Sequence, residues 1–227
     1  MTQEEQLYNA YEPFLVLLVG LPGSGKSTFA ETLVASMPNK FCRINQDELK
    51  TRPKCERKLK QVLSASPNSP WHLCPIIDRC NFDKQQRSTW YRIAEAAAKQ
   101  GSLTKSTRKV ADANTYNNTE KEERGQDRLL ASPSVLPTKS AVPVPVDVVV
   151  FDLPFDECLR RCKARKGHET IKSPHQAAGV LKQLESQWSP PHDKQNRRER
   201  SRYRSLTVIR TEKERKECLL RILKQKG

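Results

Sequence analysis

The chain contains, at Phe14–Thr28, the sequence FLVLLVGLPGSGKST. Its first part, Phe14–Val19, is apolar at every position, which is typical of a strand buried on both faces of a parallel sheet. Its second part, Gly20–Ser27, fits the phosphate-binding pattern G-x-x-x-x-G-K-[ST], and the residues after it favour a helix. A P-loop between a buried strand and a helix predicts an α/β nucleotide-binding domain.

The residue types of the loop assign chemical roles. Glycines let the backbone curl so that its N–H groups face phosphates, and the helix N-terminus adds partial positive charge. We expect Lys26 to reach the β- and γ-phosphates of ATP, Ser27 to ligate Mg²⁺ through its hydroxyl, and Thr28 to lie near the α-phosphate. The predicted nucleotide-binding set is Gly20, Gly23, Ser24, Gly25, Lys26, Ser27 and Thr28.

Strands and helices alternate along the rest of the chain. Further strands are predicted at Phe41–Asn45, Pro75–Asp78, Val146–Asp152 and Leu206–Arg210. Helices are predicted at Ser27–Met37, Cys55–Ala65, Lys84–Lys99, Phe155–Lys166, Pro174–Gln187 and Thr211–Lys226. We therefore expect a P-loop fold with a five-stranded parallel sheet in the order 2-3-1-4-5, helices on both faces and a helical lid.

Composition changes between Ser102 and Pro145, where Ser, Thr, Asn, Lys, Glu and Pro dominate and large apolar residues are sparse. Such a segment buries too little surface to offset its ordering entropy. Because the alternation of elements resumes after it, we interpret it as a disordered insertion in a single domain spanning residues 1–227.

The overall charge favours a polyanionic partner. Net charge is +15, the sequence pI is about 9.7 and mean hydropathy is −0.76. A basic surface attracts nucleic acid in the first place and an anionic membrane second. The seven cysteines show no zinc-ligand spacing, so we expect free thiols and no structural zinc. The polar segment Met1–Tyr11 and the short apolar runs predict an intracellular protein without a membrane partner, in the nucleus or cytoplasm, with the nucleus favoured. We also expect a monomer.

Two carboxylates follow predicted strands. Asp47 and Asp78 stand where the second and third strands end, and ligands of parallel sheets bind outside the carboxyl ends of strands. Asp47 is either the general base that takes a proton from an attacking hydroxyl or a cap of the next turn. Asp78 either contacts Mg²⁺, or orients the acceptor, or caps the turn.

Several polar residues near these strand ends are candidate ligands of the acceptor. Asn81 is predicted either to hold the acceptor or to cap the helix at Lys84–Lys99. Arg87, one turn into that helix, faces either a phosphate or solvent. Arg79 is predicted to contact a phosphate of the acceptor. The substrate-binding set is therefore Asp47, Arg79, Asn81 and Arg87.

Two basic segments follow the insertion. Arg161 and Arg165 are four residues apart on one predicted helix face, so they either clamp a transferring phosphoryl group or form a solvated face. Gly167-His168-Glu169 after them is a plausible lid hinge. The densest basic run, Lys194–Arg204, either binds nucleic acid, or serves as a nuclear localisation signal, or is solvated.

The motifs together resemble those of a known family. They are, in order, Gly20–Ser27, Asn45-Gln46-Asp47, Asp78-x-x-Asn81 and Arg161-x-x-x-Arg165. This order is similar to the kinase module of phage and animal polynucleotide 5′-hydroxyl kinases, and looks closer still to the P-loop kinase module joined to aprataxin-like domains in plants. The resemblance covers Phe14–Gln100 and Val146–Arg210. It implies Asp47 as base, Lys26 and Ser27 on ATP–Mg²⁺, and Arg161 and Arg165 in the lid.

The expected activity is an ATP-dependent kinase acting on 5′-hydroxyl ends of DNA or RNA. One alternative is a small-molecule kinase of the gluconate-kinase kind, against which the charge of +15 counts. Another is a binding protein in which ATP gates association with nucleic acid or tRNA without transfer. Asp47 and the pair Arg161 and Arg165 count against that alternative.

Overall fold

The computed structural model describes residues 13–65, 69, 72–97, 143–164 and 174–225. They form a five-stranded parallel sheet in the order β2-β3-β1-β4-β5, which confirms the predicted order. The strands are β1 (Leu15–Gly20), β2 (Phe41–Asn45), β3 (Cys74–Asp78), β4 (Val146–Phe151) and β5 (Ser205–Ile209). Most of the predicted insertion, the predicted hinge at 167–169 and Arg165 lie outside the described residues.

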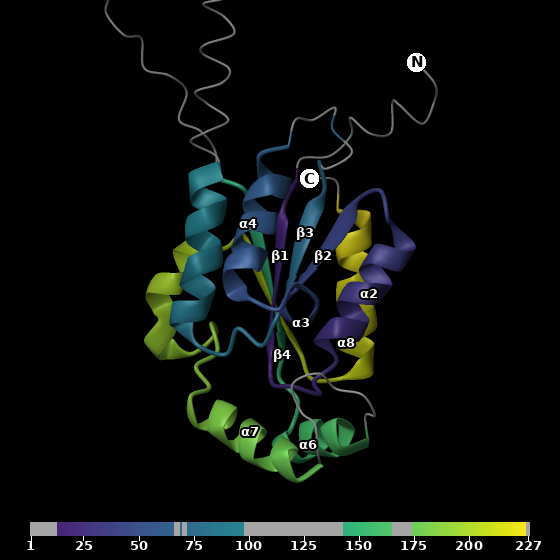
Figure 1. The fold of residues 1–227 in the computed structure, drawn as a ribbon, viewed down its shortest axis with the longest axis vertical. Helices are drawn as coiled ribbons and strands as arrows, with labels where there is room; N and C mark the ends of the chain where they lie inside the picture. Colours follow the sequence, from purple (N-terminus) through teal and green to yellow (C-terminus); the bar gives the residue numbers. More distant parts are fainter. Residues whose placement is uncertain (1–12, 66–68, 70–71, 98–142, 165–173, 226–227) are drawn as a thin grey trace, which may run out of the picture.

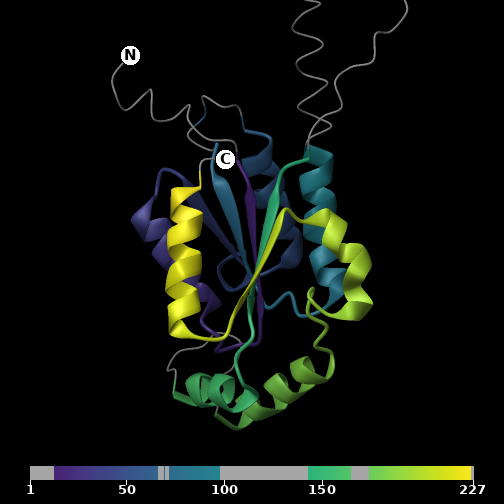
Figure 2. The ribbon, with the colours of Figure 1, turned by 180° about the vertical axis from the view of Figure 1, so that it is seen from behind.

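Helices cover both faces of the sheet (Figures 1 and 2). α2 (Lys26–Ser36) and α8 (Glu212–Lys224) pack on one face, and α4 (Arg52–Leu63) and a helix over residues 84–97 pack on the other. α6 (Phe155–Ala164) and α7 (Pro174–Ser186) lie beyond the carboxyl ends of the strands. No helix of the described ranges has both the length and the apolar composition that a bilayer crossing requires.

The central strand is buried on both sides, as its apolar sequence predicts. Every residue of β1 is buried, and alternate side chains enter different cores. Val16 and Leu18 pack with Phe29 of α2, whereas Leu17 and Val19 pack with residues of α4 and of the helix at 84–97. Because both faces are covered, polar chemistry is confined to the carboxyl edge of the sheet.

Two short helices were not predicted. α3 (Gln46–Leu49) begins directly after β2, where the Asn45 side chain accepts hydrogen bonds from the backbone of Asp47 and Glu48. η1 (Lys194–Arg202) is a 3-10 helix with a kink at Asn196, in the basic run that showed no helical pattern. Local capping forms the first, and tertiary contacts hold the second.

The helices α6 and α7, which form the predicted lid, pack directly on the P-loop. A Cβ atom at Gly23 would lie 2.4 Å from the backbone oxygen of Cys158 and 2.8 Å from Sγ of Cys162, both in α6. Cys158 and Cys162 are buried with Leu21 and with Ala177 of α7. Glycine is therefore required at position 23 both for its φ of 79° and for this close approach.

Asn81 has a different place from either prediction. Its side chain is fully buried, donates to the Leu18 backbone oxygen at 2.7 Å and accepts from Nε1 of Trp90 at 2.9 Å. Its φ of 47° lies in the left-handed region, which asparagine tolerates. Asn81 thus joins β1 to the helix at 84–97, and it neither caps that helix nor lines the cleft described below.

Arg87 is also buried, which neither prediction anticipated. Its guanidinium makes a two-pronged ion pair with Glu199 of η1, at 2.6 and 2.9 Å, and donates to the Asn81 backbone oxygen at 3.0 Å. The Tyr91 hydroxyl donates to the same carboxylate at 2.7 Å, and burial raises the pKa of Tyr91. Glu199 comes from 112 positions further along the chain, so no local pattern indicated this pairing.

We expect Glu199→Gln to lower the free energy of unfolding by about 3 kcal/mol, because the substitution keeps the shape but leaves the buried Arg87 without a counter-charge. Urea denaturation measures this. The matched control is Glu95→Gln, which weakens the partly exposed pair of Glu95 with Arg202 and should cost less than about 1 kcal/mol. Equal losses in the two variants would contradict a structural role for the Arg87–Glu199 pair.

Candidate active site

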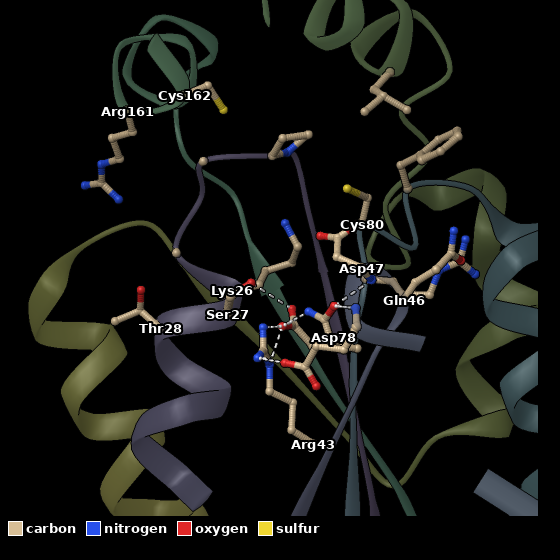
Figure 3. A pocket seen from close by; sticks show the side chains of 18 of the residues that line it. Lys26, Ser27, Thr28, Arg43, Gln46, Asp47, Asp78, Cys80, Arg161 and Cys162 are labelled. Carbon is tan, nitrogen blue, oxygen red and sulfur yellow. Dashed lines mark hydrogen bonds and ion pairs between the residues drawn. The ribbon is translucent and has the colours of Figure 1, made fainter. Parts of the chain in front are cut away.

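A cleft of about 800 Å³ opens at the carboxyl edge of the sheet (Figure 3). Its walls come from the P-loop, the start of α2, the ends of β2 and β3, α3, and the lid helices. The predicted site residues that line it are Gly23, Gly25, Lys26, Ser27, Thr28, Asp47, Asp78, Arg79 and Arg161. Gly20 and Ser24 belong to the P-loop without lining the cleft.

The P-loop has the geometry of a phosphate cradle. Gly25 precedes α2 with a φ of 98°, a left-handed conformation that a side chain disfavours. Nζ of Lys26 donates to the backbone oxygen of Leu21 at 2.7 Å and approaches Oγ of Ser24 at 3.3 Å, so the ammonium lies over the loop. The cation and the N-terminus of an 11-residue helix therefore act at the same point.

Ser27 and Asp78 meet as a candidate Mg²⁺ site. Oγ of Ser27 donates to Oδ1 of Asp78 at 3.3 Å, and the Asp78 side chain is only 2% exposed. A hydroxyl and a carboxylate oxygen at the mouth of a phosphate cradle fit Mg²⁺, which keeps several waters and binds through one or two protein oxygens and substrate phosphates. The residues present thus fit the metal that the sequence predicts.

Arg43, from β2, is the cleft residue that sequence reasoning missed. Its Nε and Nη2 both contact Oδ2 of Asp78, at 2.8 and 2.6 Å, while Nη1 lies 2.5 Å from Glu48 and 3.3 Å from Glu31 (Figure 3). Nδ2 of Asn45 also donates to Oδ2 at 2.7 Å. Oδ2 is fully engaged, and Oδ1 is the oxygen that faces Ser27. The predicted strand at Phe41–Asn45 contains Arg43 but gave no sign of its partners.

Asp47 lies on the opposite wall of the cleft from the P-loop helix. It is exposed, and it stands in the first turn of α3. The cap of that turn is the side chain of Asn45, not that of Asp47. The capping alternative for Asp47 therefore does not hold, and its carboxylate is presented to the cleft (Figure 3).

Arg79 follows β3 and lines the cleft, as do Gln46 and Asp47. Its guanidinium carbon lies 5.8 Å from the centre of the Trp90 ring, and burial lowers its pKa. Its Nη1 is buried without a hydrogen-bond partner among the described residues, as is Oε1 of Gln46. Unpartnered polar atoms beside a cleft are candidate ligand contacts.

Arg161 approaches the P-loop from the lid. A Cβ atom at Gly25 would lie 3.8 Å from its Nη1, and the side chain is 44% exposed. Its Nε donates to Oε1 of Glu157 at 2.6 Å, and hydrogen bonds from Arg160 and Arg161 lower the pKa of Glu157 to about 2. Arg161 thus stands near the P-loop, while Arg165, the other residue of the clamp hypothesis, lies outside the described residues.

With this geometry in view, comparison with known proteins identifies the class. Residues 15–191 match a protein family described as an AAA domain. Because the match spans well over half of the 227 residues, the chain belongs to this family of P-loop nucleotide-binding domains.

Individual relatives share parts of the chain. An Arabidopsis thaliana protein described as transcription factor bHLH140 is 28% identical over 177 residues, which are 78% of this chain and 14% of that protein. The Schizosaccharomyces pombe bifunctional polynucleotide phosphatase/kinase is 36% identical over 81 residues, 36% of this chain and 18% of that protein. The chain thus spans less than a fifth of the length of these curated relatives.

The fold has solved counterparts. The crystal structure of a fungal RNA kinase superposes with a TM-score of 0.53 at 12% identity, covering 96% of this chain and 100% of that one. At this identity the likeness concerns the fold alone. The resemblance to polynucleotide kinases is confirmed by the relative described as a bifunctional polynucleotide phosphatase/kinase. The Arabidopsis relative matches 78% of this chain.

We expect Arg43→Met to lower the free energy of unfolding by about 3 kcal/mol, because it removes the arginine that pairs with the buried Asp78 carboxylate and also contacts Glu31 and Glu48. The matched control is Arg210→Met, which removes an exposed pair with Asp152 and should cost less than about 1 kcal/mol. Chemical denaturation of both variants decides the matter. If Arg210→Met lowers the free energy of unfolding by as much as Arg43→Met, the Arg43–Asp78 pair contributes no more stability than an exposed ion pair.

Proposed function

We propose that the chain is an ATP-dependent kinase that transfers the γ-phosphoryl group to the 5′-hydroxyl of a DNA or RNA end. The observation that carries this proposal is the shape of the cleft. Lys26 and Arg161 lie at the P-loop, Asp47 lies on another wall, and Arg79 also lines the cleft (Figure 3). A cleft with a phosphate cradle on one wall and an exposed carboxylate on another suits phosphoryl transfer to an acceptor. A protein in which ATP only gates association needs no such carboxylate.

The nucleotide half supplies charge compensation. The backbone of Gly23–Gly25 and the ammonium of Lys26 would hold the β- and γ-phosphates of ATP. Ser27 and Asp78 would hold Mg²⁺, which when bound neutralises charge on the transferring group. Arg161 approaches from the lid and would stabilise the equatorial oxygens of that group, the part that an arginine finger takes in phosphoryl transfer.

Asp47 is the base in this proposal. It is exposed at the cleft wall, and the cap of its helix turn is another residue. Asp78 is unsuited to the same task, because both its oxygens already accept hydrogen bonds from Ser27, Arg43 and Asn45. Asp47 would accept the proton of the 5′-hydroxyl as its oxygen attacks the γ-phosphorus and the bond to the leaving ADP breaks.

The acceptor class is inferred from charge and relatives. The net charge of +15 favours a polyanionic acceptor, and Arg79, which lines the cleft, offers an unpartnered donor. The fission yeast relative is described as a polynucleotide phosphatase/kinase. Neither Asn81 nor Arg87 enters this proposal, since both side chains are fully buried.

The test is a transfer assay with γ-labelled ATP and Mg²⁺. One arm offers 5′-hydroxyl oligonucleotides of DNA and of RNA, and the other offers sugars, gluconate and free nucleosides. Label should appear on oligonucleotide ends, and Lys26→Met should abolish it. Efficient labelling of a metabolite with none on oligonucleotides would replace the proposal with a small-molecule kinase. Nucleotide binding without transfer to any acceptor would make the chain a nucleotide-gated binding protein.

We expect Asp47→Asn to lower turnover about 10²- to 10⁴-fold with little change in ATP affinity, because the amide keeps the shape but accepts no proton. Steady-state kinetics and nucleotide titration give the two numbers. The matched control is Asp193→Asn, the same substitution at an exposed aspartate that does not line the cleft. Turnover of Asp47→Asn within a few-fold of wild type would show that another group serves as base.

A further inference from the structure

The basic run after the lid divides into two sets of side chains. Arg202 and Arg204 have acidic partners, since they pair with Glu95 at 2.9 Å and with Asp147 at 2.7 Å. Asn196 and Glu199 are buried. The remaining cations, Lys194, Arg197, Arg198 and Arg200, are exposed, and within the described part of the chain no hydrogen bond or ion pair of their side chains is found.

The 3-10 geometry of η1 explains this division. Residues three apart in a 3-10 helix lie on the same face, so Asn196, Glu199 and Arg202 form the inward face. Arg197 and Arg200 share a second face, and Arg198 stands beside them. The buried side chains of Asn196 and Glu199 therefore anchor η1, while the exposed arginines between and beside them face solvent.

Hydrogen bonds through Ser189 place η1 near the part of the cleft wall formed by Phe82 and Gln86. The backbone N–H of Ser189 donates to the Phe82 oxygen at 2.9 Å, and Phe82 lines the cleft. Nδ2 of Asn196 in turn donates to Oγ of Ser189 at 2.9 Å. On the inward face, the Glu199–Arg87 pair fixes η1 to the helix at 84–97, whose residue Gln86 lines the cleft as well.

The figures agree with this placement. η1, the yellow-green turns beside the helix at 84–97, lies on the side of the sheet opposite α2 and α8 (Figures 1 and 2). The exposed cations thus belong to the side of the molecule where the cleft carries Phe82 and Gln86, not to the side of α2.

We propose that Arg197, Arg198 and Arg200 bind the phosphate backbone of the acceptor strand behind its 5′ end. The inference extends the proposed function from the terminal hydroxyl to the strand that carries it. A row of exposed guanidinium groups without acidic partners is an electrostatic fit for a polyanion, and phosphate contacts carry no base sequence. Binding by these residues needs neither ATP nor transfer.

The experiment compares two variants that remove the same charge. One is the triple variant Arg197→Ala, Arg198→Ala, Arg200→Ala. The control is Lys213→Ala, Lys216→Ala, Lys224→Ala, which takes three exposed cations from α8 on the far face of the sheet. Fluorescence anisotropy with a labelled single-stranded oligonucleotide of about 20 nucleotides, without ATP, gives affinity as a function of salt.

We expect the η1 variant to lose at least about tenfold in affinity at low salt and to flatten the plot of log affinity against log salt by about 2, since each phosphate contact on a single strand contributes about 0.7 to the slope. The α8 variant should keep the wild-type slope. Thermal midpoints and ATP affinity should be unchanged in both, because the substituted side chains lie outside the core and the cleft.

Three results would overturn the inference. They are an unchanged slope in the η1 variant, an equal flattening in the α8 variant, and η1-dependent binding to phosphatidylserine vesicles with none to the oligonucleotide. Failure of the transfer assay alone would remove the proposed function and leave this binding surface standing. Transfer to oligonucleotide ends, together with an unchanged salt slope in the η1 variant, would support the proposed function and remove this binding surface.

Discussion

A buried chain of hydrogen bonds through Asn81 joins the parts of this domain that no single strand or helix connects. Asn81 holds the Leu18 backbone of β1 on one side and Trp90 on the other, and its own carbonyl oxygen accepts from Arg87. Arg87 then pairs with Glu199 of η1. These polar groups are costly to bury unless every partner is present. The central strand, the loop after β3, the helix at 84–97 and η1 are therefore fixed relative to one another.

The cleft depends on a second arrangement of charges. Lys26 and Arg161 bring positive charge to the P-loop, while Arg43 neutralises Asp78 on the neighbouring wall. Without Arg43, the carboxylates of Glu31, Glu48 and Asp78 would lose the cation that contacts all three. With it, Asp78 keeps one oxygen toward Ser27, whereas Asp47 is an exposed carboxylate of the cleft. The hydrogen bonds that Asp78 accepts from Ser27, Arg43 and Asn45 thus distinguish its environment from that of the exposed Asp47.

The sequence predicted the fold well because the fold rests on local patterns. The all-apolar strand and the P-loop at Phe14–Thr28 identify a buried parallel strand and a helix N-terminus without knowledge of distant residues. The roles of Arg43 and Arg87 depended on partners brought by folding, in the second case from 112 residues away. Asn81 was recognised as important, but its left-handed backbone and buried contacts belong to the tertiary structure. The 3-10 helix within the basic run had no apolar periodicity by which to find it.

The same basic run therefore contains side chains with opposite uses, and only the fold separates them. Arg202 offsets a carboxylate of the neighbouring helix, whereas Arg197 and Arg200, on another face of the same helix, meet solvent. Because Glu199 is held by the buried Arg87, the exposed arginines stand on an anchored segment and not on a loose tail. Anchoring lowers the ordering cost of any ligand bound there. The buried Arg87–Glu199 pair thus also fixes the position of the exposed Arg197 and Arg200 on the surface.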